Sequence, residues 1–263
     1  MRPPGSWAMV AGASEGLGAA FAEALAERGY RLVLLARRAE ALEAVAAGLR
    51  AKTEVVTRAL DLSSPGLEAE VRELLGAREV ELLVCNAAHA PLGPFEQQPL
   101  AEKLKALDVN CRAPVTLCHL VLPGMVARRR GAIVLMSSLT AFQGSPFLAV
   151  YGATKAFNAS LAEALWAETR GSGVDVLAVC AGATRTPGYL KTARQQAPGE
   201  LAPRQVVDEA LGALGQGPLL IPGAFNRIAS FLMRRLMPRA ATVRVMGAQT
   251  AKLLRPGPAT KTG

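Results

Sequence analysis

The 263 residues are enough for one large hydrophobic core, and 51% of them are hydrophobic while 19% are charged. This composition excludes disorder over most of the chain, and the sequence has no run of about 18 apolar residues that would predict a membrane-spanning helix. The net charge of +9 is unevenly placed, because residues 210–263 hold eight basic residues and no acidic one, which leaves 9 − 8 = +1 for the preceding 209.

Short apolar runs alternate with alanine-rich amphipathic runs along the chain. The apolar runs predict strands at residues 7–11, 31–36, 54–59, 80–85, 132–137, 174–180 and 218–221. The amphipathic runs predict helices at residues 18–28, 40–51, 66–75, 101–127, 151–169 and 203–214. This alternation predicts an α/β, Rossmann-like, doubly wound sheet of seven parallel strands in a single domain.

A glycine-rich turn follows the first expected strand and precedes a helix. It reads Gly12-Ala13-Ser14-Glu15-Gly16-Leu17-Gly18, with spacing GxxxGxG. Glycine allows a tight turn and close backbone approach, and the N–H groups at the start of the next helix attract an anion. We interpret the turn as a site for the pyrophosphate of a dinucleotide; a purely structural glycine turn is the alternative.

The second expected strand ends in Arg37 and Arg38, with no acidic residue beside them. Guanidinium groups suit a 2′-phosphate, so we predict NADP(H) as the cofactor; two solvated arginines at the start of a helix are the alternative. Asp61, followed by Leu62, comes after the third strand and could bond the adenine or cap a helix, and both interpretations stay open. Asn86 and Ala87 follow the fourth strand, where a backbone must pass close to a ribose.

Tyr151 and Lys155 lie four residues apart at the start of an expected helix and therefore share one face. A lysine beside a phenol favours the phenolate and should lower the pKa of Tyr151 into a useful range. Ser138 ends the fifth strand thirteen residues before Tyr151. Ser137 also ends that strand, but the thirteen-residue spacing favours Ser138.

These motifs together resemble the short-chain dehydrogenase/reductase (SDR) family over residues 8 to about 222. The resemblance implies that Tyr151 is the general acid/base, that Lys155 binds the nicotinamide ribose and that Ser138 bonds the substrate oxygen. It also implies that Asn110 supports a proton relay to Lys155. After the sixth strand, it places Gly182, Thr184 and Thr186 at the cofactor, with Thr186 at the nicotinamide carboxamide. The family usually has proline where this chain has Ala181, which leaves the rigidity of that turn open.

The resemblance implies a domain over residues 1–255 with a substrate lid at about 186–202, followed by a flexible tail at 256–263. Candidate substrate-pocket side chains are aromatic: Phe95, Phe142, Phe147 and Tyr189. The basic helical region at about 224–254 has three possible roles. It could pack over the substrate side with its arginines in water, lie on an anionic membrane surface, or dock an acidic acyl carrier.

Four cysteines (Cys85, Cys111, Cys118 and Cys180) and two histidines show no zinc-binding spacing, so we expect no metal and reduced thiols in a cytoplasmic protein. Basic residues are not interleaved with stacking aromatics, so we expect no nucleic-acid partner. The sequence thus predicts an NADP(H)-dependent oxidoreductase of a fairly apolar, small-molecule carbonyl or secondary alcohol. A non-catalytic NADP(H)-binding regulator is the alternative function. The resemblance implies a homodimer or homotetramer, with helices 101–127 and 151–169 pairing between subunits.

Overall fold

A computed structural model describes residues 5–192 and 196–254, with side chains to residue 251 apart from that of residue 192. The expected flexible tail at 256–263 lies outside the described residues, as do residues 193–195 of the expected lid.

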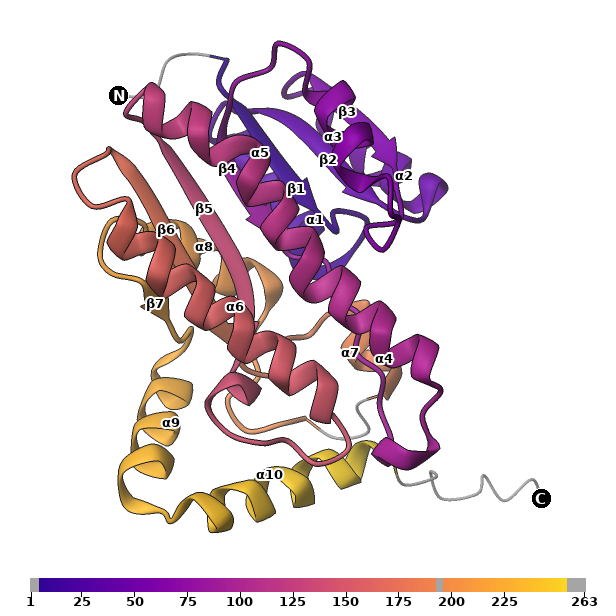
Figure 1. Cartoon of the computed structure of the whole chain (residues 1–263), viewed down its shortest axis with the longest axis vertical. Coiled ribbons are helices and arrows are strands. Elements are labelled where there is room, and N and C mark those ends of the chain that lie inside the picture. The colour runs from indigo at the N-terminus through magenta and orange to yellow at the C-terminus, as the bar shows by residue number, and fades with distance from the viewer. Residues whose placement is uncertain (1–4, 193–195, 255–263) are drawn as a thin grey trace.

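Seven parallel strands form one sheet in the order β3-β2-β1-β4-β5-β6-β7 (Figure 1). Their bounds are Trp7–Ala11 (β1), Arg31–Ala36 (β2), Val55–Ala59 (β3), Val80–Cys85 (β4), Gly131–Ser138 (β5), Val174–Ala181 (β6) and Leu219–Leu220 (β7). Every residue of β1 and β4 is buried, as continuous apolar strands covered on both faces must be. The predicted fold is confirmed, and the last strand is shorter than the run that predicted it.

Helices cover both faces of the sheet. One face carries α3 (Leu67–Leu75), α5 (Ala113–Ala127) and α6 (Ala149–Glu168), whose Leu67, Leu117 and Ala162 pack on β1, β4 and β5. The other carries α1 (Gly16–Glu27), α2 (Ala39–Leu49) and α8 (Pro203–Gly212), through residues such as Phe21, Leu42 and Val206. Each layer has its own buried cluster, so the sheet is held between two cores.

The expected helix at 101–127 is interrupted. It consists of α4 (Leu100–Leu107), one π-helical turn η2 (Asp108–Arg112) and α5. The backbone stays in the helical region throughout, so the π turn adds a residue without breaking the helix. Such an insertion changes which side chains face inward from that point, and Asn110 lies within it.

Short elements complete the carboxyl edge of the sheet. They are the 3₁₀ turns η1 (Phe95–Gln97) and η3 (Leu139–Phe142), and α7 (Pro187–Thr192), which forms part of the expected lid. The chain then ends in two helices, α9 (Ala224–Leu236) and α10 (Arg239–Leu254), which form a bent arm at one end of the molecule (Figure 1). Within the described part of the chain, no helix combines the length and apolar character needed to cross a bilayer.

Candidate active site

A pocket of about 600 Å³ opens at the carboxyl ends of the strands. It spans the point where the strand order reverses between β1 and β4, which is where open α/β sheets bind ligands. The expected site residues that line it are Gly12, Ser14, Glu15, Gly16, Leu17, Arg37, Arg38, Asp61, Leu62, Asn86, Ala87, Ser138, Tyr151, Lys155, Gly182, Thr184 and Thr186. Gly18 and Asn110 lie behind this wall, so the expected constellation gathers around one pocket.

The glycine turn is packed too closely for side chains. A Cβ on Gly18 would lie 1.9 Å from the carbonyl oxygen of Gly12, and one on Gly12 (φ +86°) would lie 2.6 Å from the backbone of Ala87. The Asn86 side-chain amide donates to the Gly12 carbonyl at 2.9 Å and fixes the turn against β4. No side chain caps α1, and its first turn holds no acidic residue. Its N–H groups are therefore available to an anion such as a pyrophosphate.

Arg37 and Arg38 both line the pocket beside the end of β2. Arg38 lies across the glycine turn, with its Nη2 2.8 Å from Glu15 Oε2 and 3.4 Å from Ser14 Oγ. Arg37 is exposed and has no ion pair with any residue that the structure describes. A phosphate bound here would contact the guanidinium of Arg38, which is ion-paired with Glu15, and that of Arg37, which has no ion pair with the described residues.

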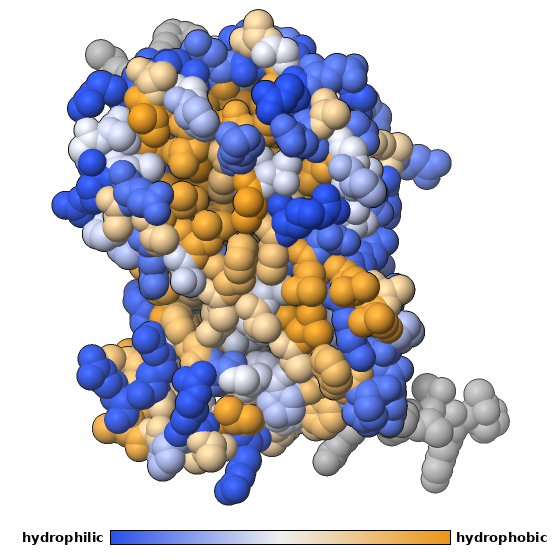
Figure 2. Space-filling model, in the orientation of Figure 1, coloured by the Kyte–Doolittle hydropathy of each residue, from blue (hydrophilic) through white to orange (hydrophobic). Residues whose placement is uncertain are grey.

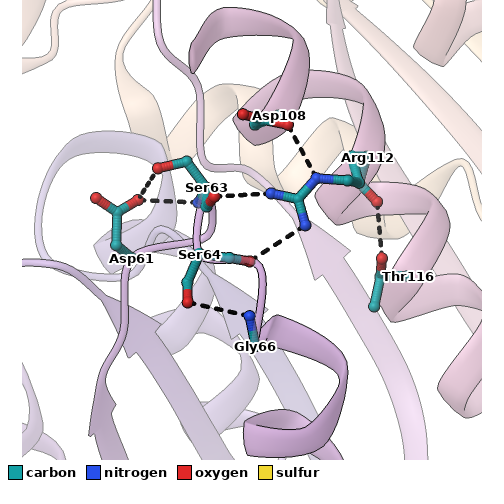
Figure 3. Close-up of polar contacts among 7 residues, drawn as sticks. All are labelled: Asp61, Ser63, Ser64, Gly66, Asp108, Arg112 and Thr116. Atoms are coloured by element: carbon teal, nitrogen blue, oxygen red, sulfur yellow. Dashed lines mark hydrogen bonds and ion pairs between the residues drawn. The ribbon is translucent and has the colours of Figure 1, made fainter. Parts of the chain in front are cut away.

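Asp61 belongs to a braced turn after β3 (Figure 3). Its Oδ1 accepts hydrogen bonds from the backbone N–H and the hydroxyl of Ser63, at 2.9 and 2.7 Å. Burial raises the pKa of Asp61, but these bonds, with the charges of Lys105 and Arg37, outweigh it and hold that pKa below its ordinary value. Asp61 thus caps its own turn rather than α3, and it is a carboxylate at neutral pH.

Arg112 holds the same turn from the π-helical side. Its guanidinium donates to the carbonyls of Ser63 (2.7 Å) and Ser64 (3.1 Å) and pairs with Asp108 at 2.9 Å (Figure 3). This side chain leaves η2 and reaches the loop that carries Asp61. The π turn therefore braces the β2–β3 end of the pocket.

Tyr151 and Lys155 project from the first turns of α6 into the pocket. The Tyr151 hydroxyl is hydrogen-bonded to Ser138, and burial raises the pKa of Tyr151 while that bond acts in the opposite direction. Lys155 is only 3% exposed, and burial lowers its pKa to about 8. Its Nζ donates to the Met136 carbonyl at 2.8 Å and lies 5.4 Å from the centroid of the Tyr151 ring.

The expected lowering of the Tyr151 pKa is wrong for this structure. The ammonium group bonds a backbone carbonyl and lies over the ring, not at the hydroxyl, so desolvation dominates. The structure also distinguishes the two serines at the end of β5, in the way that the thirteen-residue spacing predicted. Ser138 faces Tyr151, whereas the Ser137 hydroxyl donates to the Lys155 carbonyl at 2.8 Å and fastens α6 to β5.

Asn110 is fully buried and bridges two elements. Its Oδ1 accepts from the His89 N–H at 2.7 Å, and its Nδ2 donates to the His89 carbonyl (2.8 Å) and to Thr154 Oγ1 (2.9 Å). Both backbone groups of His89 are thereby satisfied by one amide. The loop after β4 is tied to the helix that carries Tyr151 and Lys155. Sequence reasoning missed His89 and Thr154, although Thr154 stands within the motif that drew attention to Tyr151.

The turn after β6 is rigid without a proline. Ala183 and Arg185 pair with Leu201 through backbone hydrogen bonds of 3.0 and 2.9 Å, which joins the two ends of the expected lid. Thr186 Oγ1 accepts from the N–H of Tyr189 at 3.2 Å and caps α7. The Thr186 side chain also lies where a Cβ on Gly16 would come within 2.9 Å, so it faces the glycine turn.

Of the four aromatic residues expected at the substrate, only Tyr189 lines this pocket. Phe95 is 56% exposed beneath the ammonium of Lys103, and Phe142 lines a separate hollow beneath the guanidinium of Arg234. Phe147 holds a left-handed backbone (φ 65°) and accepts a hydrogen bond from the Gly93 N–H through its carbonyl. Aromatic character alone did not indicate which side chains the loops turn inward.

The thiols and acids form no metal centre among the described residues. Cys85, Cys111, Cys118 and Cys180 are unpaired by disulfides, and three of them are buried. A hydrogen bond with Cys118, together with burial, raises the pKa of Cys85.

Comparison with known proteins gives one consistent result. The family model described as "short chain dehydrogenase" matches residues 6–197. A very-long-chain 3-oxoacyl-CoA reductase of Pyrenophora tritici-repentis is 32% identical over 222 residues, which cover 81% of this chain and 64% of that protein. The chain thus spans slightly less than two thirds of the length of this relative.

Solved structures agree with the sheet order. A structure described as giving insights into 7beta-hydroxysteroid dehydrogenase stereoselectivity superposes with a TM-score of 0.87 at 29% identity, covering 92% of this chain and 97% of that one. A short-chain dehydrogenase from Sphingobium yanoikuyae in complex with NADPH gives a TM-score of 0.73 at 31% identity, covering 97% and 99%. The match extends over the C-terminal arm as well as the sheet.

Proposed function

Because the chain belongs to the short-chain dehydrogenase family, and so to a family of oxidoreductases, we propose that it is an NADP(H)-dependent reductase of apolar ketones. The observation that carries the proposal is that Ser138, Tyr151 and the buried Lys155 meet in the lining of the 600 Å³ pocket, with Ser138 acting on the Tyr151 hydroxyl. A non-catalytic regulator would have no need of this arrangement.

NADP(H) fits the residues of the pocket. The uncapped start of α1 suits the pyrophosphate, and the absence of side chains at Gly12 and Gly18 permits close approach. Arg37 and Arg38 suit a 2′-phosphate, because guanidinium–phosphate bonds are charge-assisted and no acid replaces them at the end of β2. NADPH in the Sphingobium relative supports the same choice. Asp61 and Asn86 would lie along the adenosine half.

The residues of this chain supply the proton chemistry, and the nicotinamide, when bound, supplies or accepts the hydride. In reduction, the Tyr151 hydroxyl donates its proton to the carbonyl oxygen, and Ser138 donates a hydrogen bond to that same oxygen. The pKa of Lys155, about 8, keeps its ammonium form predominant at neutral pH, where it would bind the ribose of the nicotinamide half of the cofactor. Through its hydrogen bond to Thr154, Asn110 holds the first turns of α6, which carry Tyr151 and Lys155.

We also propose the substrate class. The relatives act, by their names, on a 3-oxoacyl thioester and a hydroxysteroid, which share a ketone or alcohol on a large apolar skeleton. Leu17, Val109 and Tyr189 supply apolar surface to the lining of the pocket. Leu190, the next residue after Tyr189 in α7, is exposed. A 3-oxoacyl or steroid-like ketone fits such a wall better than a sugar would.

Self-association is a further part of the proposal. Large apolar side chains are exposed on α4, α5 and α6, and Figure 2 shows them gathered on that face. They are Leu100, Leu104, Leu107, Val115, Val126 and Phe157. A homodimer through these helices would bury them; light scattering on a size-exclusion column measures the resulting mass.

The decisive experiment follows NADPH absorbance with a panel of 3-oxoacyl thioesters, steroid ketones and quinones. Tyr151→Phe should abolish turnover of any substrate found while NADPH still binds, measured by fluorescence titration. Retained turnover in that variant would contradict the mechanism, and a clear preference for NADH would contradict the cofactor.

A further inference from the structure

Helix α9 is amphipathic, but its polar side chains face the protein and its large apolar side chains face solvent. Its buried side chains are polar: Asn226 is 4% exposed and Ser230 is 2% exposed. Its large apolar side chains point to solvent, with exposed fractions of 44% to 73%: Phe225, Ile228, Phe231, Leu232 and Leu236. The region does pack on the body of the protein with its arginines exposed, as one of the three alternatives expected, but α9 leaves its apolar side chains uncovered.

Polar contacts fix this orientation. The Asn226 amide donates to the carbonyls of Gly199 and Pro222, both at 3.0 Å, and Glu209 accepts from the Gly223 N–H at 2.9 Å. Glu209 also pairs with Arg227 at 3.1 Å. Rotation of α9 to bury its apolar stripe would break all of these bonds. The stripe from Phe225 to Leu236 is an outward surface about 17 Å long, since about eleven rises of 1.5 Å separate its two ends.

Positive charge surrounds the stripe. Arg235 lies among the apolar side chains on the exposed face, and Arg239 and Arg244 follow on α10. These three arginines are exposed and have no ion pair with the described residues. No acidic residue follows Glu209 in the sequence. Figure 2 shows hydrophilic side chains projecting around the end of the molecule where α9 and α10 lie.

We propose that this C-terminal arm, α9 and α10, binds the surface of an anionic lipid bilayer. Apolar side chains flanked by arginines on a projecting helix are the pattern of helices that lie in the membrane interface. Charge complementarity selects the partner. A second copy of this chain would oppose the stripe with the same arginines or with a body whose charges nearly cancel, and neither attracts it. Anionic headgroups offer opposite charge, and acyl chains cover the stripe.

The arm also bears on substrate access. Gly199, at the end of the lid, packs against Phe225 and Asn226, where a Cβ would lie 2.6 and 2.3 Å from their side-chain atoms. Binding of α9 to a bilayer would bring the lid end to the lipid surface, where an apolar ketone is concentrated. This consequence rests on the proposed function, but the binding itself does not.

The test is co-sedimentation of the full-length chain with vesicles of phosphatidylcholine alone or mixed with phosphatidylglycerol. We expect partitioning onto the mixed vesicles only, reversed by high salt. Ile228→Ser with Phe231→Ser should weaken it more than about tenfold, whereas Phe95→Ser, similarly exposed on η1, should not. Arg235→Gln should weaken it about fivefold, and Arg72→Gln, on exposed α3, should leave it unchanged.

Circular dichroism and NADPH binding verify that each variant is folded. A loss of vesicle binding then reports the changed surface of the arm and not unfolding. Equal binding to both vesicle types, or none to either, would overturn the proposal. So would a dimer that dissociates on the Ile228/Phe231 substitution, because a second copy would then cover the stripe. None of these outcomes depends on turnover, so reductase activity and membrane binding fail or succeed separately.

Discussion

Asn110 Nδ2 donates to Thr154 Oγ1 across 2.9 Å, and this bond joins the π turn to the helix of Tyr151 and Lys155. The same turn reaches the β3 loop through Arg112. One helical turn therefore braces both ends of the pocket.

Asn110→Ala should lower both stability and kcat. It leaves the N–H and carbonyl of His89 without their partner, and each lost buried bond costs about 1–3 kcal/mol. The Thr154 hydroxyl loses one bond and keeps the one that it donates to the Tyr151 carbonyl. Chemical denaturation and steady-state kinetics measure the two effects. Thr154→Val should show a smaller loss of both, and Thr154→Ser should restore them. Unchanged kcat in Asn110→Ala at a temperature where it is folded would show that the brace does not position the helix.

Lys155→Met should stabilise the cofactor-free protein near neutral pH. Burial lowers the folded-state pKa of Lys155 to about 8, below its unfolded value of 10.5, so charging this group opposes folding at lower pH. The full penalty, about 3 kcal/mol at about 1.36 kcal/mol per pKa unit, is present below pH 8 and is relieved as the pH rises toward 10.5.

The difference in unfolding free energy between Lys155→Met and wild type should therefore shrink across that window, measured by urea denaturation. Burial also raises the pKa of Cys111 and Cys180 above the ordinary value of 9, which affects stability inside this window. The lysine is therefore read from the difference between the two proteins and not from wild type alone. A difference that is constant with pH would contradict the assignment.

Ser138→Ala and Ser137→Ala should separate catalysis from stability. Ser138 acts on the Tyr151 hydroxyl, so its loss should reduce kcat by roughly 10²-fold. Its Oγ also accepts from the Thr140 N–H at 3.2 Å, so a loss of stability of about 1 kcal/mol should accompany that fall. Ser137 anchors the Lys155 backbone, so its loss should cost about 1–2 kcal/mol of stability and affect kcat less. The reverse ranking would mean that the thirteen-residue spacing selected the wrong serine.

Arg37→Ala with Arg38→Ala should reduce kcat/KM for NADPH by roughly 10²-fold or more, because hydrogen bonds to a charged phosphate contribute about 1.5–3 kcal/mol each. The value for NADH should stay unchanged. Arg72→Ala on exposed α3 is the control for loss of a surface arginine. An equal fall with both cofactors would indicate damage to the glycine turn, which Arg38 crosses to reach Glu15.

Gly18→Ala and Gly48→Ala should change the stability of the protein in opposite directions. A methyl group on Gly18 would lie 1.9 Å from a carbonyl oxygen, so the turn must distort and cofactor affinity and stability should fall. Gly48 lies in α2 with nothing within 4 Å of an added Cβ, so its substitution should stabilise the protein by about 0.5–1 kcal/mol. Thermal unfolding with and without NADPH measures both.

The sheet and the pocket could be predicted because their signals are local. Continuous apolar runs and glycine spacing are properties of adjacent residues, and they placed Gly12, Ser138 and Tyr151 at one edge. The orientation of Lys155 could not be predicted, because it depends on the Met136 carbonyl of a neighbouring strand. Which face of α9 points to solvent could not be predicted either. The apolar pattern of its sequence is the same whichever face the contacts with Gly199 and Glu209 hold inward.

The two hydrogen bonds of Asn226 have a consequence for exchanging parts between relatives. A single amide fastens the end of the lid, at Gly199, and the first turn of the arm, at Pro222. The expected lid and the arm are thus coupled in this chain, and a chimera joined at residue 222 would pair one protein's lid with another's anchor. A junction after β6, at Ala181, keeps the two together and leaves the glycine turn, Tyr151 and Lys155 in the recipient. Such a chimera would exchange the arm and its anchor together, along with Gly182, Thr184 and Thr186 of the pocket lining.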